Sequence, residues 1–195
     1  MMGEPALKTH FTVQEYIAME QNSLEKHEYH KGEIFAMAGG KPNHALLASN
    51  TIRAIGNALI KNKKPCNTFT GDLQIAMSDE DYSYPDLSVI CGKIETYPEN
   101  PNAAKNPILI VEVLSDSTEK YDRGEKFRKY QQIPSLQEYV LITQDSMRVE
   151  VFSKHETIIF WQYRSYENPE EAIELKSIDA QISLQDIYLG WTKTD

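Results

Sequence analysis

The chain has 195 residues, with 20 lysines and arginines against 29 aspartates and glutamates, a net charge of −9 and a hydrophobic fraction of 41%. These ordinary globular proportions exclude a collagen-like, disordered or disulfide-rich protein, and at this length we expect one domain, residues 1–195, with its own core. No stretch approaches the roughly 18 apolar residues of a membrane span. With two cysteines and no apolar leader core, we expect a cytoplasmic protein that does not contact membranes.

The first part of the chain is predicted to form two helices and a hairpin. A capping-box sequence predicts a short helix over 12–21. Residues 28–38 predict two short strands around a Lys-Gly turn. Apolar residues at helical spacing then predict the longest helix, over about 42–62.

The rest of the chain is predicted to supply most of a sheet. Residues 92–106 are expected to form one long loop. A helix over about 117–132 is ended by Pro134, and a last short helix opens at Ser183. The strands are predicted at 68–77, 84–90, 107–114, 138–142, 148–153 and 157–164. This order predicts an α/β domain in which a mixed β-sheet is flanked by the helices at 42–62 and 117–132.

An acidic residue inside the most apolar predicted strand is the first functional signal. Glu112 lies in the run Ile108-Leu-Ile-Val-Glu-Val-Leu114, where a carboxylate is costly unless it is paired or bound to a metal. Asp86 leads another apolar run, so the two acids are neighbours if their strands pair antiparallel. Two such carboxylates suit Mg²⁺ or Mn²⁺. The alternative is that Asp86 caps a turn and Glu112 pairs with a buried lysine or arginine.

These and further segments together resemble a known family. The matching segments are Lys31-Gly-Glu33, Met37 to Gly40, His44, Tyr84-Pro-Asp-Leu-Ser-Val, Val111-Glu-Val-Leu-Ser115, Tyr121-Asp-Arg-Gly-Glu-Lys126-Phe-Arg-Lys-Tyr130 and Pro134-Ser-Leu-Gln-Glu138-Tyr. From about Phe11 to Trp191 their order and spacing are similar to the Uma2 family (DUF820) of the PD-(D/E)XK nuclease superfamily. The resemblance implies a restriction-endonuclease-like fold and a Mg²⁺-dependent endodeoxyribonuclease acting on nucleic acid, with DNA as the expected partner. Cutting a duplex with one active site per chain favours a homodimer.

The resemblance also implies roles for individual residues. Asp86 and Glu112 are the implied metal ligands. The superfamily expects a lysine two residues after the glutamate, but Leu114 stands there, so the following helix is the implied source, with Lys126 as first choice and Lys129 as second. Such a lysine would position the attacking water and stabilise charge in the transition state. The alternative is a surface ion pair between Lys126 and the acid one turn before it, of little energetic value.

Each secondary candidate has a structural alternative. Glu33, which the resemblance places by the site, is otherwise a half-exposed hairpin residue. His44 is a candidate phosphate contact or ligand-orienting group, or a solvated residue at a helix start. Asp72 and Gln74 are expected to border the site from one strand face, unless Asp72 is a turn residue. Ser115 either supports the neighbouring glutamate through a hydrogen bond or caps the next helix.

Two other sites are disfavoured, and two other functions stay open. His27 and His30 are three apart, so in a strand they point to opposite faces and cannot ligate one ion as in a cupin. Cys66 and Cys91 have no histidine nearby in sequence, which disfavours a catalytic cysteine. The negative charge and the missing lysine favour a non-catalytic nucleic-acid-binding or protein-interaction module with the same fold. A metal-dependent hydrolase of small phosphoesters is the third class.

Overall fold

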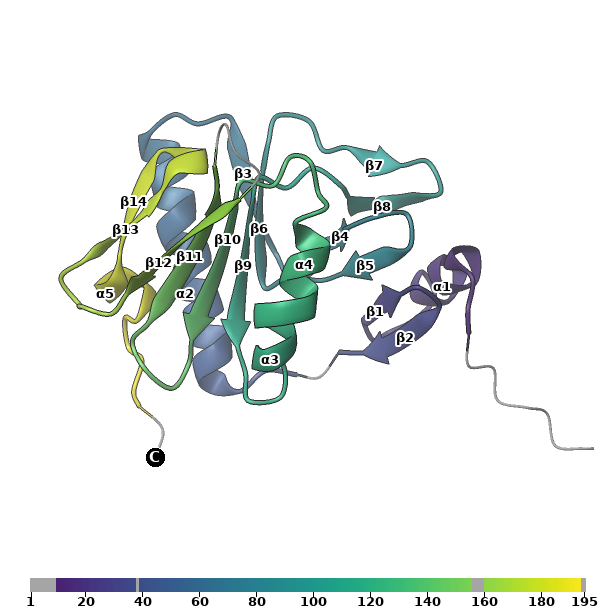
Figure 1. Cartoon of the computed structure of the whole chain (residues 1–195), viewed down its shortest axis with the longest axis horizontal. Helices are drawn as coiled ribbons and strands as arrows, with labels where there is room; N and C mark the ends of the chain where they lie inside the picture. Colours follow the sequence, from purple (N-terminus) through teal and green to yellow (C-terminus); the bar gives the residue numbers. More distant parts are fainter. Residues whose placement is uncertain (1–9, 38, 156–159, 194–195) are drawn as a thin grey trace, which may run out of the picture.

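The computed structural model describes residues 10–37, 39–155 and 160–193. Within them the strands form two six-stranded sheets and one two-stranded hairpin, flanked by helices (Figure 1). The helical segments are α1 (Val13–Glu20), α2 (Pro42–Lys61), α3 (Glu119–Tyr121), the π-helical turn η1 (Asp122–Lys126), α4 (Phe127–Tyr130), the 3₁₀ turn η2 (Lys176–Ile178) and α5 (Leu184–Ile187). The predicted class, an α/β fold with mixed sheets and flanking helices, is confirmed, with the strands divided between two sheets.

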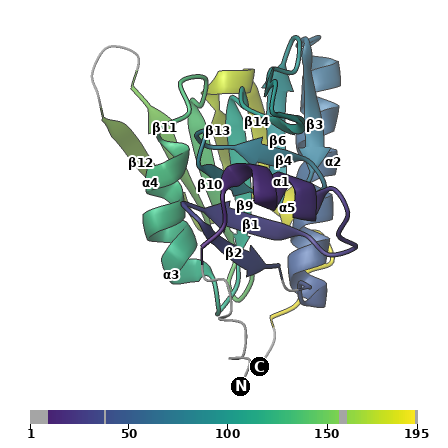
Figure 2. The ribbon, with the colours of Figure 1, turned by 90° about the vertical axis from the view of Figure 1, so that its right-hand side faces the viewer.

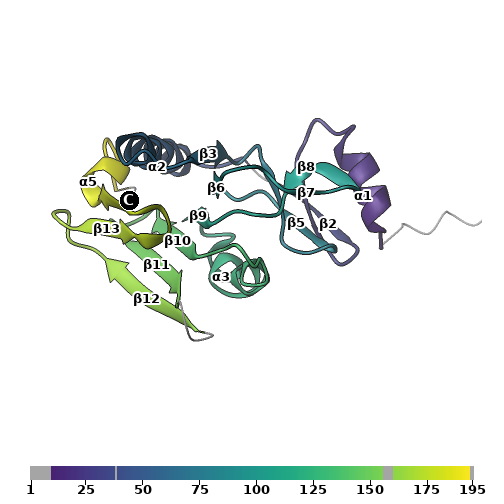
Figure 3. The same cartoon turned by 90° about the horizontal axis from the view of Figure 1, so that it is seen from above.

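Sheet B is the central layer of the molecule. Its strands are β3 (Cys66–Thr70), β6 (Leu87–Cys91), β9 (Leu109–Leu114), β10 (Glu138–Thr143), β11 (Val149–Lys154) and β12 (Trp161–Tyr166), in the order β12-β11-β10-β9-β6-β3. β9 runs parallel to β10 and antiparallel to β6. Every residue of β9 is buried, because α2 covers one face of the sheet and the α3–α4 segment covers the other (Figure 3).

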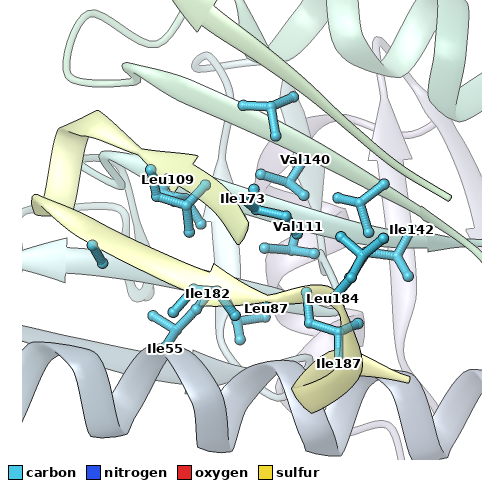
Figure 4. Close-up of a cluster of buried hydrophobic side chains, with 14 of the residues drawn as sticks. Ile55, Leu87, Leu109, Val111, Val140, Ile142, Ile173, Ile182, Leu184 and Ile187 are labelled. Carbon is cyan, nitrogen blue, oxygen red and sulfur yellow. The ribbon is translucent and has the colours of Figure 1, made fainter. Parts of the chain in front are cut away.

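The larger core lies between sheet B and α2. Buried residues of α2 recur every four positions at Leu47, Thr51, Ile55 and Leu59, which forms one stripe facing the sheet. The hairpin of β13 (Ala172–Leu175) and β14 (Ala180–Ser183), followed by α5, closes this core from the side (Figure 4). Burying each of its larger aliphatic side chains stabilises the fold by roughly 1.5–3 kcal/mol.

Sheet A stands beside sheet B and carries α1 on its outer face (Figure 2). Its strands are β1 (His27–His30), β2 (Glu33–Ala36), β4 (Gln74–Ala76), β5 (Asp81–Ser83), β7 (Thr96–Tyr97) and β8 (Asn100–Ala104), in the order β2-β1-β5-β4-β8-β7. The turn between β1 and β2 has positive φ at both Lys31 and Gly32, as a two-residue hairpin turn of primed type requires.

Several local predictions need correction. The strand predicted over 68–77 is two strands, β3 and β4, which belong to different sheets and are separated by a turn at Gly71. The loop predicted over 92–106 contains β7 and β8, which pair with each other, and β8 also pairs with β4. The sequence analysis did not predict the β13–β14 hairpin. Residues 157–159 of the strand predicted over 157–164 lie outside the described residues.

The two cysteines lie opposite each other on neighbouring strands of sheet B. Cys66 of β3 pairs in register with Cys91 of β6, and the structure joins them in a disulfide. The sequence analysis expected two cysteines without a disulfide framework, and this single cross-strand link is what the fold forms instead. None of the helices in the described segments has the length and apolar character needed to cross a bilayer.

Candidate active site

The hairpin β1–β2 sorts polar from apolar side chains. Its register places Glu28 opposite Phe35 and His30 opposite Glu33, and directly opposed residues of antiparallel strands point to the same side. These four side chains therefore share one face of sheet A. Tyr29 lies on the other face and stacks against α1. One face of the sheet is thus packed in a core, and the other presents charged and polar groups.

This polar face forms one wall of a cavity of about 750 Å³. The carboxyl end of β9, the start of α2 and the α3–α4 segment form the other walls. Among the described residues, carboxylates that line the cavity outnumber lysines by seven to three. These ionisable lining residues are Glu28, Glu33, Asp86, Glu112, Asp116, Asp122, Glu125, Lys41, Lys126 and Lys129, together with His30 and His44.

Asp86 and Glu112 meet in this cavity, as the sequence analysis expected if their strands paired antiparallel. β6 and β9 pair antiparallel with Leu87 opposite Val111, so the next position along the ladder brings Asp86 to Glu112. The backbone N–H of Asp86 donates to Glu112 Oε2 at 3.4 Å, and the backbone N–H of Val113 donates to Asp86 Oδ2 at 2.7 Å. The two acids from distant segments therefore form one carboxylate pair.

Lys126 joins this pair from the π-helical turn. Its Nζ lies 2.8 Å from Glu112 Oε1, 3.1 Å from Glu28 Oε1 and 3.7 Å from Asp122 Oδ1. Lys126 and Asp122 are both buried, so the alternative of a solvated surface ion pair is wrong. Lys129, the second choice, instead contacts Glu125 at 3.2 Å and Asp81 at 3.7 Å.

The buried setting separates the proton affinities of the two glutamates that contact Lys126. Burial raises the pKa of Glu112 to about 8, against the lowering effect of Lys126. Burial also acts on Glu28, but Lys126 and the hydrogen bonds from its neighbours outweigh it and lower the pKa of Glu28 to about 2. Burial alone would lower the pKa of Lys126, yet the carboxylates of Glu112, Glu28 and Asp122 raise it well above its usual value. Lys126 is therefore a permanent cation in this site.

Glu28 is a site residue that the sequence analysis missed. It accepts a hydrogen bond from Ser83 Oγ at 2.5 Å, and its Oε2 lies 3.5 Å from His30 Nε2. His30 is further held by Asp81, 3.2 Å from its Nδ1, and by the hydroxyl of Tyr121. The alternation of side chains along the strand 27–30 could have indicated it, because it places Glu28 on the face opposite the apolar Tyr29.

Tyr130 of α4 was also missed. Its hydroxyl donates to Glu112 Oε1 at 3.0 Å and lies 3.2 Å from Ser83 Oγ. Oε1 of Glu112 is thus occupied by Lys126 and Tyr130, while Oε2 has only the long contact with the backbone of Asp86. Oε2 of the buried glutamate is therefore the less engaged of its two oxygens.

His44 holds the other acid. Its Nε2 lies 2.8 Å from Asp86 Oδ1, and this hydrogen bond raises the pKa of His44 against the effect of burial. Its Nδ1 is buried and has no hydrogen-bond partner among the described residues. His44 therefore lies where it can hold Asp86 in position, and its role as a ligand-orienting group stays a prediction.

The remaining candidates divide between the cavity and other surroundings. Glu33 lines the cavity from the exposed end of its face, and Ser115 lines it while its hydroxyl caps the next turn at the N–H of Thr118. Asp72 lies outside the cavity, because it is an exposed turn residue held by Lys26 and Thr70.

Gln74 and the rejected candidates lie elsewhere. Gln74 is buried under α1, where its amide donates to the hydroxyl of Tyr16 and accepts from Asn100. His27 contacts Glu20 on the face opposite His30, as predicted. The disulfide of Cys66 also lies outside the residues that line the cavity.

The oxygens of this site fit a hard divalent cation. In the described part of the chain no three His, Cys, Asp or Glu side chains are arranged to hold a metal ion. The carboxylates of Asp86 and Glu112 nevertheless converge in an open cavity, and Glu112 Oε2 has only one long contact, at 3.4 Å, with the backbone N–H of Asp86. Mg²⁺ usually binds through one or two carboxylates and keeps several waters. The number of carboxylates that Asp86 and Glu112 offer therefore matches the usual protein ligands of this ion.

Comparison with known proteins places the chain in a family. Residues 13–185 match the family model of Uma2, described as "Putative restriction endonuclease". The chain belongs to the Uma2 family. It is 35% identical over 178 residues to the uncharacterized protein slr1290 of Synechocystis sp. (strain ATCC 27184 / PCC 6803 / Kazusa), covering 91% of this chain and 90% of the relative. It is 38% identical over 144 residues to sll1609 of the same organism, covering 73% and 80%.

A solved structure shares the Uma2 fold seen here. It is described as "a putative nuclease belonging to DUF820" from Anabaena variabilis ATCC 29413 and superposes with a TM-score of 0.73 over 93% of this chain and 98% of that chain. At 18% sequence identity this similarity establishes the fold. The Uma2 resemblance that the motifs indicated is thus confirmed.

Proposed function

We propose that this Uma2 protein is a metal-dependent endonuclease that hydrolyses phosphodiester bonds in nucleic acid. The supporting observation is the convergence of Asp86, Glu112 and Lys126 from three segments of the chain in one cavity, with Lys126 Nζ 2.8 Å from Glu112 Oε1. A carboxylate pair can hold a divalent ion that activates water, and a buried ammonium can stabilise the charge that develops on the phosphate.

Asp86 and Glu112 are the proposed ligands of Mg²⁺ or Mn²⁺. A bound divalent ion would polarise the phosphoryl oxygens and lower the pKa of a water. His44 fixes the orientation of Asp86 through its 2.8 Å contact with Oδ1. Tyr130 holds Glu112 through its hydrogen bond to Oε1, and Oε2, with only the 3.4 Å contact from Asp86, is the proposed metal-binding oxygen.

Lys126 is the proposed electrostatic group. Its raised pKa keeps the ammonium protonated, so it can stabilise negative charge on the phosphate but cannot accept a proton from water. Glu28 is a positioning residue, since its Oε1 lies 3.1 Å from Nζ and gives the ammonium a second carboxylate partner besides Glu112. The substrate identity as DNA, the homodimer, the cytoplasmic location and the single domain stay predictions.

The test is a cleavage assay with supercoiled plasmid and circular single-stranded DNA, in Mg²⁺ and in Mn²⁺. We expect the wild-type protein to cut, and Glu112→Ala and Asp86→Asn to lose metal-dependent cleavage. Lys126→Met is expected to lose about 10²–10³ in rate, as for removal of one preorganised charge-stabilising group. Circular dichroism verifies that each variant is folded.

Glu95→Gln is the matched control, because Glu95 is an exposed acid outside the cavity. It removes one negative charge and is expected to cut like the wild type. Wild-type protein that binds nucleic acid but does not cut it in either metal would establish the non-catalytic module instead. Cleavage of a small phosphodiester without any DNA binding would establish the small-molecule hydrolase.

A further inference from the structure

Two exposed apolar side chains stand at the mouth of the acidic cavity. Phe35 and Met37 line it, and their exposed fractions are 48% and 39%. Phe35 belongs to β2, the edge strand of sheet A, and lies on the same face as Glu28. Its ring centroid is 5.7 Å from that of His30. A half-exposed aromatic ring therefore lies beside His30 in the same cavity as the proposed catalytic groups.

The cations of the same cavity are already engaged by carboxylates. Lys126 is held by Glu112 and Glu28, Lys129 lies 3.2 Å from Glu125, and Lys41 lies 2.8 Å from Asp116. In the described part of the chain, seven carboxylates line the cavity against three lysines. Binding to the phosphate backbone of a duplex depends on lysines and arginines that displace counterions. The described lining of the cavity supplies few such residues that are not already paired with a carboxylate.

We infer that the cavity binds one nucleotide of a single-stranded or unpaired segment of nucleic acid, with the base stacked on Phe35 and packed against Met37. The inference rests on the proposed function and specifies its substrate class. Stacking on an aromatic side chain contributes about 1–3 kcal/mol per base and tolerates any base. It needs no positive charge, so it is compatible with an acidic site in which a duplex backbone would be poorly held.

The size and position of the cavity agree with this occupant. About 750 Å³ lies within the range of roughly 300–1,000 Å³ of pockets that enclose a ligand of nucleotide size. In a duplex both faces of each base are covered by its neighbours, so a base reaches a side chain beside the reacting phosphate only when it leaves the stack. An unpaired nucleotide reaches both Phe35 and the carboxylate pair without that cost.

The test measures binding rather than cleavage. Fluorescence anisotropy in Ca²⁺ compares three labelled DNA probes of equal length: a single strand, a blunt duplex, and a single strand of abasic sugar-phosphate. We expect the wild type to bind the single strand more tightly than the other two. Phe35→Ala is expected to weaken single-strand binding by about 5- to 150-fold, the equivalent of one stacked base, and to leave binding of the abasic strand unchanged.

Phe35→Leu and Phe35→Trp separate stacking from general apolar contact. Leucine keeps an apolar side chain but has no ring, so it should behave like alanine, whereas tryptophan should restore binding. Ile60→Ala removes a side chain with 79% exposure at the end of α2, outside the cavity, and should bind like the wild type.

The outcomes distinguish the two proposals. Tight duplex binding, or a Phe35→Ala variant that binds and cuts single strands like the wild type, would overturn the base-stacking site and leave the nuclease proposal intact. Wild-type protein that binds none of the three probes would overturn both. Equal binding of the abasic and ordinary single strands would show that the backbone alone is recognised.

Discussion

Lys126 contacts two carboxylates whose pKa values are shifted in opposite directions. Glu28 has its pKa lowered to about 2 by Lys126 and by hydrogen bonds, against the effect of burial, while burial raises the pKa of Glu112 to about 8. Glu28 is thus the permanent counterion of Lys126. Glu112 is the carboxylate that can still exchange a proton for a metal ion near neutral pH. This division assigns a structural anion and a metal ligand to two acids that touch one ammonium.

The contribution of Glu28 to the stability of the fold is expected to depend on pH. Its native pKa lies below the ordinary value of 4.5, so the unfolded chain binds the proton first and stability falls as the pH drops from 4.5 to 2. At pH values above 4.5, this shift in pKa corresponds to about 3 kcal/mol of folding stability. We expect Glu28→Gln to lower the free energy of unfolding by this order at pH 7 in urea titrations. The deficit should shrink toward pH 2.

Glu33→Gln is the matched control for that comparison, because Glu33 is an exposed acid on the same hairpin. Its effect on stability should stay within about 0.5 kcal/mol. A Glu28→Gln variant with the same stability as the wild type at pH 7 would show that Lys126 needs only Glu112.

Metal binding is expected to release a proton from Glu112. With a pKa of about 8, this carboxyl is mostly protonated at pH 7 in the metal-free protein, and a divalent ion requires it deprotonated. Mg²⁺ affinity should therefore rise with pH up to about 8 and then level off. Calorimetric titration in two buffers of different ionisation enthalpy should detect nearly one proton released at pH 7. The release should be absent from Glu112→Gln, and metal binding without it in the wild type would contradict the assignment.

Asp86, Glu112 and Lys126 were predictable because each lies in a short local pattern. Glu112 interrupts an apolar strand, Asp86 follows a proline, and Lys126 lies in a motif segment of the next helix. Glu28 and Ser83 come together only because β1 and β5 are neighbours in sheet A. No local pattern encodes that pairing, so the second partner of Lys126 could not be read from the sequence.

At the scale of elements, the segment after β9 is one helical run interrupted by a π turn. The predicted helix over 117–132 is divided into α3, η1 and α4. A π turn is wider than an α turn and often occurs at functional sites. Here it directs both Asp122 and Lys126 inward, and both are buried. The helix was predictable from its periodicity, but the π turn was not, because it depends on the buried partners of these two side chains.

Gly124 lies inside this helical run and offers a test of the scaffold without touching the site. A Cβ built at Gly124 meets nothing within 4 Å, and its φ is not positive. Glycine in a helix interior is less stable than alanine by about 0.5–1 kcal/mol. We expect Gly124→Ala to raise the free energy of unfolding by this amount and leave cleavage unchanged. Lost cleavage in a more stable variant would show that the π turn must flex during the reaction.

The main feature of the fold that could not be predicted from the sequence is the division of the strands between two sheets. The strand predicted over 68–77 alternates well enough to be taken as continuous, yet β3 pairs with β6 while β4 pairs with β5 and β8. Strand pairing is decided by partners far away in the chain. By contrast, β9 and α2 were predictable because an apolar run and a helical stripe are local properties.

At the scale of the whole molecule, the site exists because two sheets meet. The two sheets and the α3–α4 segment lie next to one another (Figure 1). Sheet B brings Asp86 and Glu112 together, sheet A brings Glu28 and His30, and the α3–α4 segment adds Lys126 to the lining of the cavity. Two of the five basic residues between Lys120 and Lys129 line the cavity. The side chains of Lys126 and Lys129 turn inward. The chain as a whole has more acidic than basic residues and a net charge of −9.

This charge distribution predicts a weak salt dependence of nucleic-acid binding. For single strands the slope of log K against log salt is about −0.7 for each phosphate neutralised. Because the cavity lysines are engaged by carboxylates, we expect a slope no steeper than about −1.5. Asp116→Asn removes the partner of the exposed Lys41. It should tighten single-strand binding and steepen the slope by about 0.7. A wild-type slope near −4 would mean that exposed cations elsewhere, such as Lys120 and Arg128, carry the contact.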